Sequence, residues 1–144
     1  EVERTSWQVE HGGSRVQVDL DVGDLQAGEH RTPIEEIEFE LLDGPASAVV
    51  GLARAVAAEL PARLGVLSKA ERGAALMEGR LGHPVKAAPL HLQEGMTVAE
   101  AFAAIVHACL KHFRMNEDLV IADRTAGALH QARVALRRLR SAFT

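Results

Sequence analysis

The stretch from His130 to Phe143, HQARVALRRLRSAF, decides how the C-terminal part of the chain folds. Drawn at about 100° per residue, it forms a helix with two distinct faces. The apolar face holds Leu129, Ala132, Ala135, Leu136, Leu139 and Phe143. The opposite face holds His130, Arg133, Arg137, Arg140 and Ser141, with Arg138 at its flank. No carboxylate side chain follows Thr125, so the pattern predicts a helix that binds a polyanion. The alternative is a solvated basic face of a bundle helix.

A second helix is predicted to begin at Thr97, because Glu100 stands at the capping-box position three residues later. We expect it to run to about Arg114 and to bury an apolar stripe of Val98, Ala101, Phe102, Ile105 and Cys109. Residues 116–128 then form a connector, and Thr125 caps the last helix. His107, Lys111 and Arg114 form a second basic stripe, which we hypothesise faces the first one across an anion groove. The alternative is a solvated basic face.

The N-terminal part alternates polar and apolar residues with the two-residue period of β-strands. Strands are predicted over residues 1–10, 15–22 and 33–42, with a turn at 11–14 and a loop at 23–32. In the third strand, Glu36, Glu38 and Glu40 share one face, about 7 Å apart along the strand. Carboxylate oxygens of this kind suit Mg²⁺ or Mn²⁺ rather than zinc. The alternative is a half-exposed strand with solvated glutamates.

The domain organisation is predicted from the positions where the helical and strand patterns of polar and apolar residues end. Residues 47–60 read as an alanine-rich helix with Ser47 as its N-cap. Glycines and prolines interrupt every period over residues 81–94, which are predicted to form a linker. The sequence therefore predicts an α+β chain: an antiparallel sheet with a helix in 1–80, the linker 81–94, and helices in 95–144.

Composition narrows the class of protein. The net charge of −4 and the acidic first 44 residues argue against a nucleic-acid binder, and few aromatic side chains accompany the arginines. A single Cys109 predicts no disulfide framework and fits the reducing cytoplasm. No apolar run approaches the roughly 18 residues of a membrane span. The chain begins with a charged, strand-like segment rather than Met, which we expect of a fragment.

The last helix carries a resemblance to a known family. HQARVALRRLRSAF resembles the signature of the CHAD domain, the conserved-histidine α-helical domain, and the similarity extends back to about Met96 and includes Asn116. In that family such helices line a basic groove for inorganic polyphosphate. The resemblance implies that polyphosphate is bound by His130, Arg133, Arg137, Arg138 and Arg140.

The N-terminal part is similar to the C-terminal half of CYTH domains, the triphosphate tunnel metalloenzymes. The similarity lies in Arg4-x-x-Trp7, Asp21-x-Gly23, the strand from Pro33 to Leu41, and Ser68-Lys69. These enzymes are antiparallel barrels with polar side chains inside the tunnel. The resemblance implies that Glu36, Glu38 and Glu40 are the catalytic metal ligands for Mg²⁺ or Mn²⁺. By the same resemblance Arg4 and Lys69 bind substrate phosphate, Asp21 lies near the tunnel wall, and Arg72 is a weaker candidate.

One departure from the CYTH pattern affects the expected activity. The E-x-E-x-K strand with which the family begins is not found in this sequence, so half of the barrel is expected to be missing unless a second copy completes it. CYTH and CHAD domains commonly occur fused in this order. The resemblance implies a CYTH–CHAD protein that hydrolyses inorganic triphosphate and binds polyphosphate; the alternative is a non-catalytic polyphosphate-binding module.

Overall fold

The computed structural model describes residues 1–143, which form two compact units. The first unit is Glu1–Gly79, and the second begins at Arg80. The first contains β1 (Val2–His11), β2 (Ser14–Ala27), β3 (His30–Asp43), α1 (Ser47–Glu59) and α2 (Lys69–Met77). The second contains α3 (Val98–Ala122) and α4 (Ala126–Ser141). The predicted α+β class is confirmed.

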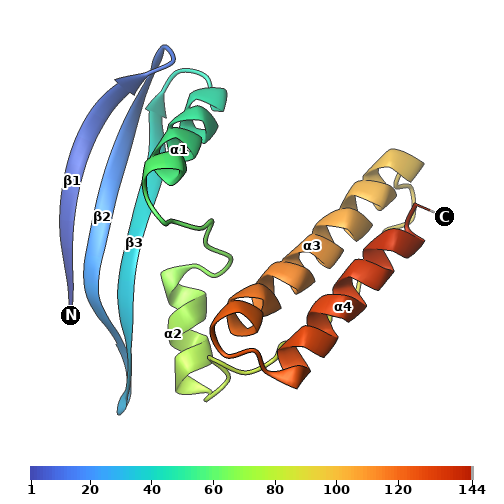
Figure 1. The fold of residues 1–144 in the computed structure, drawn as a ribbon. Helices are drawn as coiled ribbons and strands as arrows, with labels where there is room; N and C mark the ends of the chain where they lie inside the picture. Colours follow the sequence, from blue (N-terminus) through green and yellow to red (C-terminus); the bar gives the residue numbers. More distant parts are fainter. Residues whose placement is uncertain (144) are drawn as a thin grey trace. The chain divides into compact units, whose positions relative to one another are not determined.

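The three strands form one antiparallel sheet in the order β1-β2-β3 (Figure 1). The sheet is open and is not closed into a barrel. The predicted loop at residues 23–32 is wrong, because β2 and β3 extend through it to a tight turn at Gly28 and Glu29. The start of β1 packs closely against Gly23, where the Cβ of any other residue would lie 2.3 Å from the carbonyl oxygen of Glu1. Glycine there lets the sheet continue where the sequence indicated a loop.

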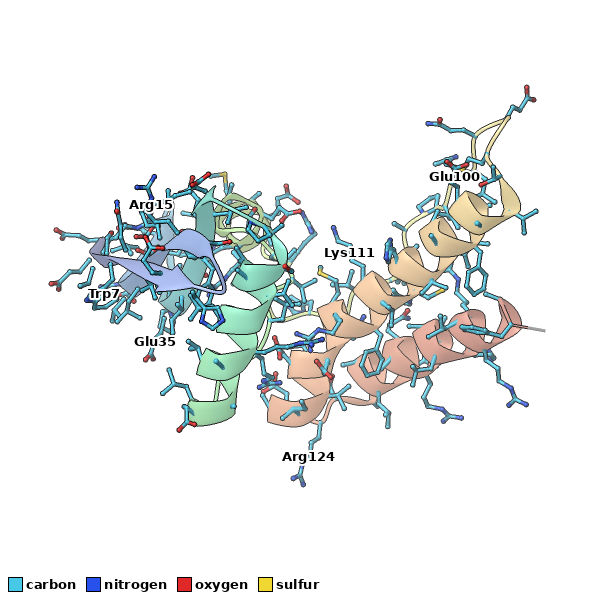
Figure 2. All side chains as sticks on the ribbon, turned by 90° about the horizontal axis from the view of Figure 1, so that it is seen from above. Trp7, Arg15, Glu35, Glu100, Lys111 and Arg124 are labelled. Carbon is cyan, nitrogen blue, oxygen red and sulfur yellow. The ribbon has the colours of Figure 1, made fainter. Side chains whose placement is uncertain are left out.

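The register confirms the predicted alternation of faces. Arg4 lies opposite Asp21, which lies opposite Glu36, so these side chains share one face of the sheet. Asp19 lies opposite Glu38 on the same face. Figure 2 views the sheet from above, roughly along its strands, and shows Arg15 on this polar side and Trp7 and Glu35 on the other. The polar face is therefore assembled from all three strands.

The two helices of the first unit cover different faces and different ends of the sheet. Gly51 of α1 lies against His11, on the Trp7 face near the β1–β2 turn, and α2 packs with Gly73 against Leu25 on the polar face. The structure places Ser47 inside α1, whose N-cap is Ala46 with no side-chain cap, so the predicted Ser47 cap is wrong. A capping box of Ser68 and Glu71 instead fixes the start of α2.

In the second unit, α3 and α4 form an antiparallel hairpin (Figure 1). The predicted caps Thr97 and Thr125 both accept backbone hydrogen bonds, but the predicted connector 116–128 is wrong, because α3 continues to Ala122. Asn116 is fully buried within α3. Its side-chain amide donates to the carbonyl oxygen of Val85 and accepts from the Val85 N–H, which offsets the cost of burying it. The segment predicted as a linker is thus hydrogen-bonded to α3.

A line of small residues lets the two helices of the hairpin approach closely. Ala128, Ala132 and Ala135 of α4 are buried, and Cys109 is buried on α3. Leu129 and Leu136, predicted on the buried face, are about half exposed at 49% and 48%. Val98, predicted to be buried in α3, is 88% exposed. The hairpin therefore keeps apolar surface beside its basic residues.

The turn between the helices is three residues long. Arg124 in this turn adopts a left-handed backbone with φ of 51°, and its side chain points away from the hairpin (Figure 2). None of the described helices combines the length and apolar character needed to cross a membrane.

Candidate metal centre and anion-binding helix

Three carboxylates converge on the polar face of the sheet. Asp21 of β2 and Glu36 and Glu38 of β3 each place an oxygen so that all three lie within 4.8 Å of one another. We call these three residues the carboxylate cluster. Asp21 is 1% exposed, whereas Glu36 and Glu38 are partly exposed. Carboxylate oxygens at this spacing are the donor set of Mg²⁺ and Mn²⁺ sites, so the cluster could hold such an ion.

The side chain of Lys69, the first residue of α2, lies at the centre of the carboxylate cluster. Its Nζ is 2.5 Å from Asp21, 2.6 Å from Glu36 and 2.7 Å from Glu38. Burial alone would lower the pKa of Lys69, but hydrogen bonds to the three carboxylates outweigh it and raise that pKa above its usual range. Lys69 therefore places a positive charge at the point where the three oxygens converge.

Arg4 of β1 closes the other side of the cluster. Its Nε and Nη2 donate to the two carboxylate oxygens of Asp21 at 2.7 and 2.6 Å, and Nη2 also donates to Glu38 at 2.7 Å. Nη1 donates to Asp19 at 3.0 Å. The hydrogen bonds from Arg4, and then from Lys69, hold the pKa of Asp21 far below its ordinary value. This bidentate pairing fixes the buried Asp21 as an ionised acceptor.

Two further side chains support the same face. Asp19 is nearly buried, and hydrogen bonds from Ser6 and Gln17, followed by the charge of Arg4, lower its pKa. Arg72 of α2 lies 3.4 Å from Glu36 and donates to the carbonyl oxygen of Pro33 at 3.1 Å. The face therefore carries both cations that could contact phosphate oxygens and carboxylates that could hold a metal.

The structure sorts the residues that the sequence predicted for this site. It brings Arg4, Lys69, Glu36 and Glu38 together, and Arg72 lies beside them. Glu40 lies two residues beyond Glu38 on β3, opposite Gln17, and is not part of the cluster. Asp21 takes that third position. The sequence did carry a signal for Asp21, because it belongs to the alternating polar positions of β2, but only the register places it beside Glu36.

The second candidate site is the basic face of α4. His130, Arg133, Arg137 and Arg140 are exposed, and Arg138 is partly buried. Among residues 1–143 no carboxylate lies within ion-pairing distance of these four arginines. The sequence pattern of the last helix predicted this stripe of arginines without carboxylate partners.

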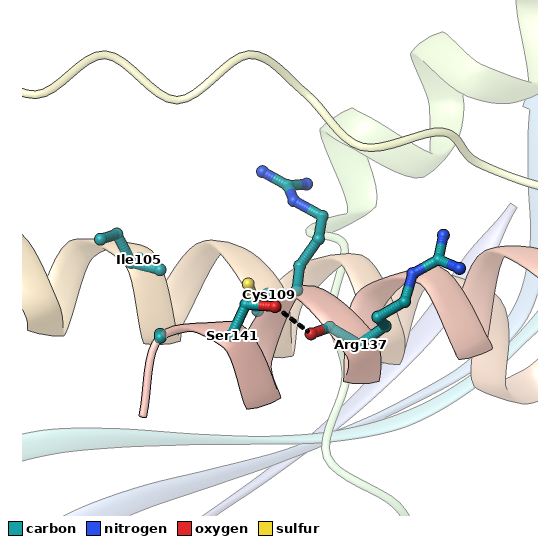
Figure 3. Close-up of a pocket in the computed structure, with 6 residues that line it drawn as sticks. Ile105, Cys109, Arg137 and Ser141 are labelled. Carbon is teal, nitrogen blue, oxygen red and sulfur yellow. Dashed lines mark hydrogen bonds between the residues drawn. The ribbon is translucent and has the colours of Figure 1, made fainter. Parts of the chain in front are cut away.

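A shallow pocket of about 380 Å³ lies beside the stripe, between α3 and the end of α4 (Figure 3). It is lined by Ile105, Cys109, Arg137, Arg138, Ser141 and Ala142. Ser141 donates a hydrogen bond to the backbone carbonyl of Arg137 at 3.1 Å. The pocket offers two guanidinium groups beside an apolar floor.

The hypothesised groove between the two basic stripes does not form in the hairpin. His107 and Lys111 are exposed on α3, each about 160° around the helix from the buried Cys109. They therefore point away from α4. Arg114 forms an ion pair with Glu117 on α3 itself.

His112 and Gln131 were not singled out by the sequence. His112 is buried, and its Nε2 lies 3.0 Å from the carbonyl oxygen of Val85 and 3.2 Å from the side-chain oxygen of Gln131. Both partners are acceptors, so Nε2 carries the hydrogen. This network joins residue 85 to both helices and has a structural role in the hairpin.

Comparisons with known proteins agree with part of the predicted kinship. Residues 104–144 match the family model of the CHAD domain, which confirms that resemblance. A stretch of 70 residues, 49% of the chain, is 39% identical to the inorganic triphosphatase of Haemophilus influenzae (strain ATCC 51907 / DSM 11121 / KW20 / Rd). The matched stretch spans one fifth of that relative's length. The CYTH assignment of the first unit stays a prediction. The C-terminal part of the chain is thus similar to the CHAD domain, and about half of the chain is distantly related to an inorganic triphosphatase.

Proposed function

We propose that this chain belongs to a protein that binds and hydrolyses inorganic triphosphate with Mg²⁺ or Mn²⁺. The observation that carries the proposal is the polar face of the sheet, where the carboxylate cluster lies among Lys69, Arg4 and Arg72. The relative described as an inorganic triphosphatase supports the same substrate class.

The cluster fits a divalent metal by its donor chemistry. Asp21, Glu36 and Glu38 supply oxygen ligands only, and a cationic nitrogen already lies between them. A bound metal would neutralise phosphate charge and activate water. Glu40, two residues beyond Glu38 on the same face, would act as an outer carboxylate rather than as a member of the cluster.

The chain's own residues would position the substrate. Arg4 offers a planar guanidinium to phosphate oxygens, although four of its hydrogen bonds now go to carboxylates. Lys69 and Arg72 approach from α2, on the same face of the sheet. Phosphoryl transfer requires mainly positioning and charge stabilisation, which such an arrangement supplies.

The test is phosphate release from tripolyphosphate with Mg²⁺ or Mn²⁺ by the wild-type chain and two variants. Glu38→Gln removes a carboxylate from the cluster. Glu35→Gln makes the same change on the same strand but on the opposite face. The proposal predicts release that falls at least about a hundredfold in Glu38→Gln and is unchanged in Glu35→Gln. Equal release by all three proteins, or none by the wild type, contradicts catalysis by this chain.

A second function is supported by α4 independently. Its arginines are unneutralised within the described part of the chain, and the CHAD match covers the whole helix. Polyphosphate binding by His130, Arg133, Arg137, Arg138 and Arg140 would then proceed without turnover. Binding that weakens steeply with added salt and survives Glu38→Gln supports this module.

A further inference from the structure

We propose that Lys69 is a built-in counter-ion that a divalent metal displaces from the carboxylate cluster, after which its ammonium is free to contact phosphate. This inference rests on the proposed function and goes beyond it, because it assigns Lys69 two successive partners. It also predicts that metal binding changes the exposure of one particular amine.

The geometry of Lys69 carries the inference. Its Nζ lies 2.5–2.7 Å from one oxygen of each member of the cluster. Metal–oxygen distances are about 2.0–2.1 Å for Mg²⁺ and about 2.3–2.6 Å for Ca²⁺. A metal bound by the same three oxygens would therefore occupy nearly the position of Nζ. The ammonium and the metal cannot both be there.

The charges of the face favour the exchange. Four carboxylates, Asp19, Asp21, Glu36 and Glu38, are met by three cations, Arg4, Lys69 and Arg72. One negative charge is left over, so the site attracts a further cation. A divalent ion that takes the place of the ammonium brings more positive charge to the three oxygens than the ammonium did.

Lys69 is also able to move. It is the first residue of α2, and its side chain is 26% exposed, so the stem has a route to solvent. The backbone at this point is held by the capping box of Ser68 and Glu71, which does not involve the Lys69 side chain. The four-carbon stem can therefore swing while the helix stays in place. Arg4, with its bidentate bond to the buried Asp21, has no comparable freedom.

The first test measures the exposure of the amine directly. The chain has three lysines, Lys69, Lys86 and Lys111, so two serve as internal controls in the same molecule. The full chain is acetylated briefly with and without Mn²⁺, and each lysine is quantified by peptide mass spectrometry. Displacement predicts that Mn²⁺ increases the labelling rate of Lys69 several-fold and leaves Lys86 and Lys111 unchanged. An unchanged or lower rate at Lys69, in a protein that has bound Mn²⁺, overturns the inference.

The second test separates displacement from general electrostatics. Lys69→Met and Arg72→Met each remove one positive charge from α2 near the cluster, but only Lys69 lies between all three carboxylates. Calorimetric titration with Mn²⁺ alone should show about tenfold tighter binding in Lys69→Met and a much smaller gain in Arg72→Met. Equal gains in the two variants overturn displacement.

Glu38→Gln distinguishes failure of this inference from failure of the proposed function. If Mn²⁺ binding is weakened by Glu38→Gln but Lys69 labelling does not change, the metal site stands and displacement is wrong. If Glu38→Gln and Glu35→Gln bind Mn²⁺ as the wild type does, the metal site itself is wrong, and displacement is overturned with it.

Discussion

The two charged regions of this molecule handle their arginines and lysines in opposite ways. On the sheet, Arg4 and Lys69 are each paired with three carboxylates. On α4, the arginines have no carboxylate partner among residues 1–143, and most are exposed. A phosphate group would have to compete with internal carboxylate partners on the sheet, whereas on α4 it would meet cations without such partners among residues 1–143. Similar residue types are therefore paired with carboxylates in one unit and lack such partners, among residues 1–143, in the other.

The largest effect is expected from breaking the internal pairing on the sheet. Asp21→Asn removes the ionised acceptor that Arg4 and Lys69 share at a site only 1% exposed. We expect a loss of about 2 kcal/mol in the free energy of unfolding of the first unit, because hydrogen bonds to a charged group are lost. Urea unfolding followed by the fluorescence of Trp7, the single tryptophan, measures it.

Asp24→Asn is the matched control on the same strand. Asp24 forms a 2.5 Å ion pair with Arg31, but the arginine side chain is 67% exposed. Exposed ion pairs contribute little, so a change under about 0.5 kcal/mol is expected. Equal losses in the two variants would mean that burial does not distinguish these carboxylates.

The open site should lose affinity when its free cations are removed. The double change Arg133→Gln and Arg137→Gln should weaken polyphosphate binding about tenfold, because two charge-assisted contacts are lost. Arg54→Gln, an exposed helical arginine in the first unit, should change binding less than twofold. Fluorescence anisotropy with labelled polyphosphate compares them, and a loss shared equally by Arg54→Gln would assign binding to net charge alone.

A smaller effect is expected from a variant that destabilises α4 without changing its charge. Thr125 caps α4 by accepting from the Ala128 N–H, so Thr125→Ala should cost the second unit about 1 kcal/mol. Ser47→Ala is the control, since Ser47 was predicted to be a cap but makes no capping bond. Thermal unfolding by circular dichroism should show the difference, while polyphosphate affinity should stay within twofold. A destabilised Ser47→Ala would contradict the assigned caps.

Acidification gives the smallest effect. The folded pKa of Asp21 lies below its ordinary value of 3.8, so the unfolded chain binds the proton more tightly than the folded one. The contribution of Asp21 to stability is therefore complete above about pH 4 and is lost as the pH falls below it. Urea midpoints of the first unit between pH 6 and pH 3 should fall in the wild type and fall less in Asp21→Asn. Parallel slopes would show that other groups cause the acid sensitivity.

The faces of the strands could be predicted from the sequence, but their lengths and register could not. The two-residue period placed Arg4, Glu36 and Glu38 correctly on one face, because side chains alternate strictly along a strand. The period could not show that Asp21, rather than Glu40, is the third carboxylate of the cluster. That depends on which residues of β2 and β3 lie opposite each other. The register of β2 against β3 is fixed by the tight turn at Gly28 and Glu29, from which the pairing continues without a shift to Val16 and Leu41.

The error at the C-terminal end of α3 has a different cause. Residues 116–128 were predicted to form a connector, whereas Asn116 is buried on the helix that continues through them. Burying a polar side chain costs free energy unless it is hydrogen-bonded. The cost is offset by Val85, which both donates to and accepts from the Asn116 amide. Such a partner is 31 residues away and leaves no local signal. The capping pair of Thr97 and Glu100 is local, and it was predicted correctly.

We propose that the carboxylate cluster binds a divalent metal at the position of the Lys69 ammonium. An anomalous difference map from crystals of the chain grown with Mn²⁺ tests it most directly. We predict a peak within about 2.5 Å of oxygens of Asp21, Glu36 and Glu38, with the Lys69 side chain turned out of the cluster. A map with Lys69 in place and no peak between the three carboxylates would contradict the claim.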